Sequence, residues 1–230
     1  MKITTKITFL DNFLLGILAG VAIAVGGVLN IVCLSIGQKL LGSVSFSVGL
    51  LTVCFFGLHL FTGKVGYFSE NNRKFLLSLL IMYIGNVIGA VGFGYILRAV
   101  GFADGDFMNT VNSVSTKKLI DIGSGVGQNW ITMFGLAFLC CNLVFLAVDI
   151  YKKNENWFVK IIGIVICVAL FVYSGMEHCV ADMFYLAVGN QFAINLLPSI
   201  LGILVSSLGN AFGAIALHEI VKYSSLNHII

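Results

Sequence analysis

A membrane-length segment in the second half of the chain carries three ionisable side chains near its middle. Residues 157–188 are mostly apolar, yet Glu177, His178 and Asp182 lie within them. Ionisable groups at that depth are costly and usually face a cavity or a pathway rather than lipid. Gly175 comes just before them, and glycine tolerates backbone conformations that interrupt a helix. The segment therefore predicts a broken membrane helix whose break carries a histidine.

The composition is typical of an integral membrane protein. Hydrophobic residues make up 59% of the 230 residues and charged residues 10%, which is more apolar than an ordinary soluble domain. The net charge of +3 is small, so no nucleic-acid partner is expected. The six cysteines lie in apolar runs without the paired spacing of a zinc site, so we expect buried thiols and no metal or other cofactor. No cleavable signal peptide is expected, because the first apolar run is too long.

Six membrane crossings are expected along the chain. Four uninterrupted spans are predicted at residues 13–34, 75–97, 130–150 and 196–221. The apolar run 44–56 is too short to cross alone and leads into the glycine-flanked stretch 57–63, so this span is expected to be broken, as is 157–188. Residues 38–43 are expected to form a turn and residues 100–129 a polar outer loop.

The order of whole, broken and whole helix recurs in two halves, at about 13–99 and 130–221, joined by the 100–129 loop. Because each half has an odd number of spans, the halves must insert in opposite senses. This predicts an inverted repeat within a single transmembrane channel domain, residues 1–230. The two breaks then meet near the bilayer midplane, where free N–H groups and helix N-termini favour an anion.

The basic residues predict that both termini are cytoplasmic and that the protein crosses the inner or plasma membrane several times. The turns assigned to the inside carry Lys2, Lys6, Arg73, Lys74, Lys152, Lys153, Lys160 and Lys222. The loops assigned to the outside carry only Lys39, Arg98, Lys117 and Lys118. This excess agrees with the positive-inside rule.

Several motifs resemble the formate/nitrite transporter family, whose members are pentameric membrane proteins with an aquaporin-like fold. The resemblance runs through all six spans, and the Gly-x-Glu-His string is its most specific part. The motifs that carry it are Phe13–Gly20, Phe46–Leu50, Gly57–Gly63, Tyr83–Gly89 and Ser174–Met183. The resemblance implies an all-α channel, a homopentamer in the lipid bilayer, and passage of a small monovalent anion such as formate, nitrite or hydrosulfide.

The resemblance also assigns the substrate pathway. It makes His178 the central histidine of the pore and Thr62 the threonine of an omega-shaped loop in the first break. Taken alone, His178 could be a buried histidine that donates to a carbonyl, and Thr62 could bond its own helix. An imidazole can hold or lend a proton near neutral pH, so a weak-acid anion could be protonated or strongly hydrogen-bonded here.

Apolar rings on either side of His178 would exclude hydrated ions by making dehydration costly. The resemblance places Leu60 and Phe171 in the constriction on the cytoplasmic side. It places Phe46 and Leu50 in the outer constriction. Phe61 is also expected on the pathway.

Three polar residues of the breaks are expected to support the backbone rather than contact the anion. Glu177 would repel an anion, so we expect it to brace the broken helix. The family usually has an acid in place of His59 and an asparagine in place of Asp182. We expect Asp182 to pair with a neighbour across the break. His59 could brace the first break or titrate near the pore, and we favour bracing.

Members of the family commonly carry a lysine ahead of the fourth span, but an ungapped alignment puts Gly125 there. The nearest lysines are Lys117 and Lys118, which we expect to be solvated loop charges; whether either replaces the family's lysine stays open. Asn86 and Asn142 are expected to be interhelical hydrogen-bond partners.

Two other function classes remain as alternatives. A neutral-solute channel of the aquaporin type is disfavoured, because the paired Asn-Pro-Ala boxes are missing and the chain has one proline. A membrane enzyme could use Glu177 and His178 as acid and base. No nucleophile, metal cluster or cofactor loop accompanies them in the sequence, so we expect no enzymatic activity.

Overall fold

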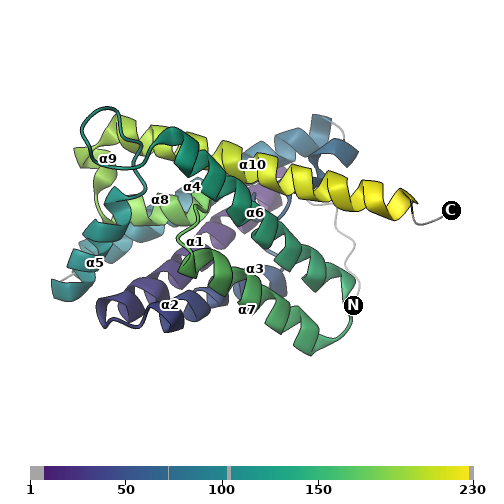
Figure 1. Ribbon diagram of the computed structural model, residues 1–230, viewed down its shortest axis with the longest axis horizontal. Helices are drawn as coiled ribbons and strands as arrows, with labels where there is room; N and C mark the ends of the chain where they lie inside the picture. Colours follow the sequence, from purple (N-terminus) through teal and green to yellow (C-terminus); the bar gives the residue numbers. More distant parts are fainter. Residues whose placement is uncertain (1–7, 72, 103–104, 228–230) are drawn as a thin grey trace.

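The computed structural model describes residues 8–71, 73–102 and 105–227, and this part of the chain is helical and contains no β-strand. Its one β-bridge joins Ile120 and Gln128. The helices that are long and apolar enough to cross a membrane are α1 (Phe9–Ser35), α4 (Arg73–Ala99), α6 (Trp130–Lys153) and α10 (Leu196–Asn227). Figure 1 shows α10 extending along most of the length of the molecule. A multi-pass membrane protein fits these helices.

The shorter apolar helices are interrupted at both positions that the sequence predicts. Helices α2 (Lys39–Ser45) and α3 (Ser47–Phe55) follow one another and stop at the first break, which leads into the 3-10 helix η1 (Val65–Glu70). Helix α7 (Trp157–Tyr173) stops at the second break, and α8 (Cys179–Val188) follows it. A short helix α9 (Gln191–Ile194) then connects to α10. We call residues 56–64 the first break and residues 174–178 the second break.

Two expectations about polar segments are wrong. Residues 38–43 are not a turn, because α2 begins at Lys39 and extends the apolar run of α3. The polar segment 100–129 contains a helix, α5 (Gly105–Thr116). Phe107, Val111 and Ser115 recur at four-residue spacing and are buried, so one face of α5 packs on the protein although its composition is polar.

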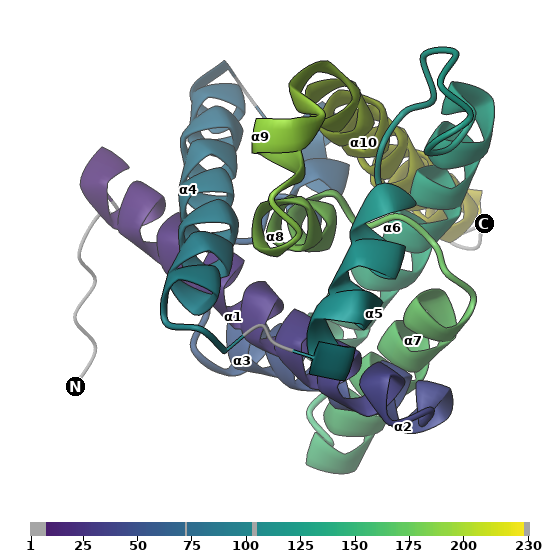
Figure 2. The same ribbon diagram turned by 90° about the vertical axis from the view of Figure 1, so that its left-hand side faces the viewer.

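The uninterrupted helices pack in pairs, with α1 along α4 and α6 along α10. Glycine permits this close approach: a Cβ on Gly20 would lie 2.4 Å from the Asn86 carbonyl oxygen, and one on Gly213 would lie 2.1 Å from that of Phe138. Figure 2 shows α8 at the centre, surrounded by α1, α4, α5 and α10. All ten residues of α8 are buried, so this short helix forms part of the core.

Candidate functional site

Both breaks begin with the same helix ending. Gly57 and Gly175 have left-handed backbones, with φ of 62° and 71°. The next N–H groups, of Leu58 and Met176, each bond a carbonyl five residues earlier, at 2.9 and 3.0 Å. This is the Schellman ending of a helix, in which glycine is preferred because its backbone carries no Cβ. Each apolar helix therefore stops at a defined residue.

An asparagine from a long helix holds the first break. The Asn86 amide of α4 donates to the carbonyl oxygens of His59 at 2.9 Å and Gly16 at 2.8 Å. Its oxygen accepts the Phe61 N–H at 2.9 Å. The first-break backbone is thereby tied to both α1 and α4, as expected for an interhelical partner.

A second asparagine holds the second break with the same three hydrogen bonds. The Asn210 amide of α10 donates to the carbonyl oxygens of Glu177 at 2.9 Å and Ala137 at 2.7 Å, and its oxygen accepts the Cys179 N–H at 2.9 Å. The sequence interpretation missed Asn210 and chose Asn142, whose amide instead bonds Phe138 of its own helix. Comparing the last helices of the two halves could have found it.

His178 and Thr62 bring the two breaks into contact. The Thr62 Oγ1 lies 2.9 Å from the His178 Nε2, and both residues are buried. His178 also caps α8, because its Nδ1 accepts the Ala181 N–H at 3.3 Å. A neutral imidazole whose Nδ1 accepts carries its proton on Nε2, so the ring donates to the Thr62 hydroxyl. That hydroxyl keeps its own proton free to donate to another group.

A buried lysine lies beside His178, between two carboxyl groups. The Lys118 Nζ is 2.6 Å from Glu177 Oε2 and 3.4 Å from Asp182 Oδ1. Gln128 Nε2 donates to the other Glu177 oxygen at 2.5 Å. Burial lowers the pKa of Lys118, but the two carboxyl groups outweigh it and raise the pKa above its usual value. The expectation of a solvated loop charge is wrong for Lys118 and holds for the exposed Lys117.

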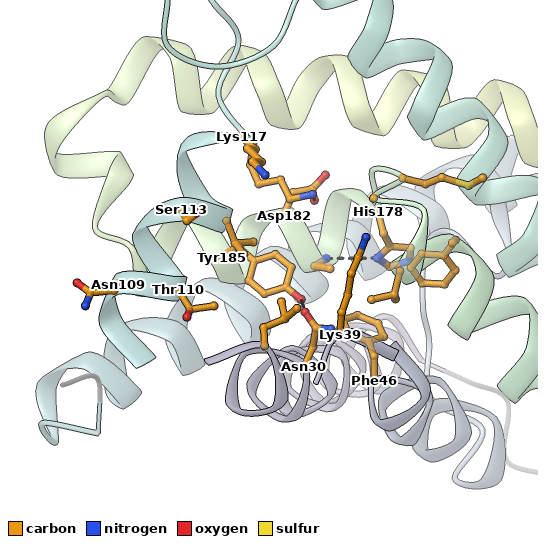
Figure 3. Close-up of a pocket in the computed structure, with 18 residues that line it drawn as sticks. Asn30, Lys39, Phe46, Asn109, Thr110, Ser113, Lys117, His178, Asp182 and Tyr185 are labelled. Atoms are coloured by element: carbon orange, nitrogen blue, oxygen red, sulfur yellow. Dashed lines mark hydrogen bonds and ion pairs between the residues drawn. The ribbon is translucent and has the colours of Figure 1, made fainter. Parts of the chain in front are cut away.

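A wide cavity of about 650 Å³ leads to His178 from one side. Its polar lining comes from α1, α2, α5, α8 and the segment after α5, as Figure 3 shows. The lining includes three lysines and one acid, which are Lys39, Lys117, Lys118 and Asp182. The Tyr185 hydroxyl donates to Asn30 Oδ1 at 3.2 Å across the same cavity. The lining of the wide cavity therefore carries more basic than acidic side chains.

A narrow cavity of about 300 Å³ lies on the other side of the breaks. It is lined by Leu60 and Gly57 of the first break and by two lysines, Lys64 and Lys152. Lys152 and Lys64 also line a third, surface cavity that includes Lys153 and Lys222. The lysines of the two sides thus fall into separate groups.

The structure moves Phe171 from the constriction to which the resemblance assigned it. The Phe171 ring packs edge-on against Phe46 with centroids 5.8 Å apart, and stacks on His178 at 5.9 Å. Both phenylalanines line the wide cavity, whereas Leu60 lines the narrow one. Pairing Phe171 with Leu60 is wrong, because Phe171 contacts Phe46 and His178 and the two residues line different cavities. Leu50, one turn beyond Phe46 on α3, is buried.

His59 and Phe61 of the first break both contact neighbouring long helices. His59 bonds Asn12 of α1 through Nδ1, and its N–H donates to the Leu15 carbonyl at 3.2 Å, so it braces the first break. Phe61 packs edge-on against Tyr83 of α4, with centroids 4.9 Å apart. Its place on a substrate pathway stays a prediction.

Comparison with known proteins agrees with this fold. The profile of the formate/nitrite transporter family matches residues 1–224. A "probable formate transporter" of Methanothermobacter thermautotrophicus is 31% identical over 225 residues, covering 83% of this chain and 82% of that protein. The formate channel FocA of Haemophilus influenzae is 28% identical over 158 residues, which cover 66% of this chain and 54% of FocA. This chain thus matches only about half the length of that relative.

Solved structures share the arrangement of the helices. A "pentameric formate channel with formate bound" superposes with a TM-score of 0.81 at 23% identity, covering 96% of this chain and 98% of that one. An "FNT family ion channel" gives a TM-score of 0.81 at 22% identity, with coverages of 94% and 90%. With a family profile that spans nearly every residue and a common fold, this chain belongs to the formate/nitrite transporter family.

Proposed function

We propose that the protein is a membrane channel or transporter for a small monovalent anion, of which formate, nitrite and hydrosulfide are the candidate species. The observation that carries the proposal is the contact between Thr62 and His178, at 2.9 Å, formed by two opposite breaks at the end of the wide cavity. The relatives named above are channels or transporters. An enzymatic role has no comparable support.

The charges on both sides of this contact favour an anion over a neutral solute. Lysines line the wide cavity and the narrow cavity, and a cluster of one sign raises the local concentration of the opposite ion. Between them, the Phe46–Phe171 pair and Leu60 form apolar constrictions, and the buried Leu50 belongs with Phe46 in the outer one. A hydrated ion loses water there, which is costly. An anion that accepts a hydrogen bond from the Thr62 hydroxyl, or from the His178 Nε2–H in place of Thr62, recovers part of that cost.

The same geometry supports six crossings arranged as inverted halves, residues 13–99 and 130–221, within one domain. The matching Schellman endings and the matching bonds of Asn86 and Asn210 are what two copies of one three-helix unit would produce. We place the wide cavity outside and both termini in the cytoplasm, since the more numerous basic residues then face inward. We further propose a homopentamer with one pore in each subunit; the pentameric assembly of the solved relative supports the pentamer.

Liposomes that contain the purified protein test this function. Uptake of formate, nitrite or hydrosulfide should exceed that of chloride, which cannot take up a proton. His178→Ala should slow uptake at least about tenfold, because one hydrogen bond to an anion contributes about 1.5–3 kcal/mol. Stopped-flow fluorescence with an anion- or pH-sensitive dye measures the rate.

His218→Ala is the matched control, because His218 lies at the far end of α10, beside Glu70. It should leave uptake unchanged. Size-exclusion chromatography must show the same oligomer for each variant. Uptake by His178→Ala at the normal rate would remove the histidine mechanism, and no anion uptake by the unaltered protein would remove the function.

A further inference from the structure

Asp182 is a buried acid whose carboxyl group lacks the partners that its neighbours have. It is 2% exposed and lines the wide cavity, on the first turn of α8 beside His178. Neither of its oxygens has a hydrogen-bond partner among the residues that the structure describes. The closest cation is the Lys118 Nζ, at 3.4 Å. Figure 3 shows Asp182 on the side of the cavity where Lys117 enters.

Glu177, rather than Asp182, makes the close ion pair with Lys118 and the hydrogen bond with Gln128. One of its oxygens lies 2.6 Å from Lys118 Nζ and the other accepts from Gln128 at 2.5 Å. Both oxygens of this carboxylate are therefore satisfied, and its charge balances the ammonium. A second buried carboxylate would share the same cation and would leave its oxygens without donors, which costs several kcal/mol. The neutral acid form of Asp182 avoids that cost.

We propose that Asp182 holds a proton in the wide cavity and passes it to the entering weak-acid anion, so that anion movement is linked to proton movement. The inference rests on the anion-transport function proposed above. An asparagine at this position, which the family resemblance makes the usual residue, has no proton to give.

The surroundings of Asp182 suit this role. The charged and titratable groups that face it are Lys118, Glu177, Tyr185, Cys140 and Cys179. The wide cavity adds His178, Lys117 and Lys39. Among these groups, Lys118 is the cation that lies within 4 Å of Asp182 and can stabilise its carboxylate.

In the transfer, the O–H bond of the Asp182 carboxyl breaks and the proton forms a new bond to the anion, which becomes a neutral acid. The carboxylate that remains is stabilised by the Lys118 ammonium. It is then reprotonated by hydronium that reaches the wide cavity from the outer solution. One proton thus enters with each anion, and the neutral acid passes the Phe46–Phe171 pair without the cost of dehydrating a charge.

Liposomes that contain a pH-sensitive dye and either the unaltered protein or Asp182→Asn test the proposal with formate at one acidic and one neutral external pH. The unaltered protein should take up formate faster at acidic pH and acidify the vesicle interior. Asp182→Asn should lose this acceleration and be at least about tenfold slower at acidic pH, since a positioned acid contributes about a hundredfold or more. Asp182→Glu should retain part of it.

Asp106→Asn is the matched control, because it removes an exposed acid from α5 without altering the cavity. An assembled Asp182→Asn variant that keeps the full acid acceleration overturns the inference and leaves the anion function standing. An unaltered protein that shows uptake without acid acceleration also overturns it. Absence of any anion uptake by the unaltered protein instead removes the proposed function.

A second measurement needs no variant. Infrared spectra of the unaltered protein, with and without carboxyl-labelled aspartate, should show a protonated carboxyl band at neutral pH that shifts with the label. If no aspartate contributes such a band, Asp182 does not hold a proton and the inference fails. This result stands even if Asp182→Asn does not assemble.

Discussion

The first and second breaks have the same backbone support and different side-chain chemistry. Gly57 and Gly175 end their helices with the same left-handed turn, and Asn86 and Asn210 make equivalent bonds. Three residues after Gly57, however, comes Leu60, whereas His178 occupies the corresponding position after Gly175. The hydrogen bonds that support a broken helix and the side chains that it presents are therefore separate properties of the sequence.

The segments that follow the breaks differ as well. After the second break, α8 is buried at every residue. After the first break, the chain forms the short η1, whose end is tied to α10 by surface ion pairs of Glu70 with His218 and Lys222, at 3.2 and 3.3 Å. Burial holds every residue of α8, whereas η1 combines buried residues at its start, Val65 and Gly66, with ion pairs at its end.

The largest effect is expected from removing the supporting asparagines. Asn86→Ala and Asn210→Ala should each lower the free energy of unfolding by about 2–5 kcal/mol, because three buried hydrogen bonds are lost and each contributes about 0.6–1.7 kcal/mol in membrane proteins. Unfolding of the detergent-solubilised protein, followed by circular dichroism, measures the change.

Asn142→Ala is the control for both variants, since its amide bonds only within α6. It should cost about 1 kcal/mol or less. If the losses in free energy of unfolding caused by Asn86→Ala and Asn210→Ala differ by more than about twofold, the two asparagines do not support their breaks equally. Equal costs would strengthen the proposed inverted repeat.

A smaller effect is expected from the glycines that begin the breaks. Gly57→Ala and Gly175→Ala should each destabilise by about 1–2 kcal/mol, because a Cβ disfavours the left-handed backbone. A Cβ would meet nothing within 4 Å at either position, or at Gly92 within α4. Gly92→Ala should therefore stabilise by about 0.5–1 kcal/mol. Thermal unfolding of the three variants separates the effect of backbone strain from that of steric contact. If Gly175→Ala raised the unfolding temperature, a left-handed backbone at Gly175 would be contradicted.

The smallest effect concerns the ion pairs behind the first break. Hydrogen bonds from Lys222 and His218 lower the pKa of Glu70 from its usual value. A lowered pKa stabilises the fold above the unfolded-state pKa, and this stability is lost as the pH falls through the folded-state value. Glu70→Gln should therefore reduce the loss of unfolding temperature between neutral and acidic pH. The effect should shrink in high salt, because the pairs are exposed.

Glu155→Gln, at an exposed acid between α6 and α7, is the control for this measurement. It should leave the acid sensitivity unchanged. If Glu70→Gln has the same acid sensitivity as the unaltered protein, the ion pairs do not hold η1, and both downstream segments are held by burial.

Some features of the fold and the site could be predicted from the sequence, and others could not. The positions of the two breaks could be predicted from the sequence, because they depend on local residue type and on the length of an apolar run. Lys118 was misread, because a polar loop in the sequence gives no sign that its lysine is buried. Phe171 was assigned to the wrong constriction, since a position along a helix does not fix the side to which its ring turns.

The sequence by itself determined a helical membrane protein with two interrupted helices and a histidine, His178, in the second interruption. Apolar run length and glycine position act locally, so they need no knowledge of distant contacts. Only the tertiary structure decided which groups meet. Thr62 and His178 are 116 residues apart and Lys118 and Glu177 are 59 apart, yet each pair is in contact. Such contacts depend on how whole helices pack, and the energy of that packing is distributed over the entire chain.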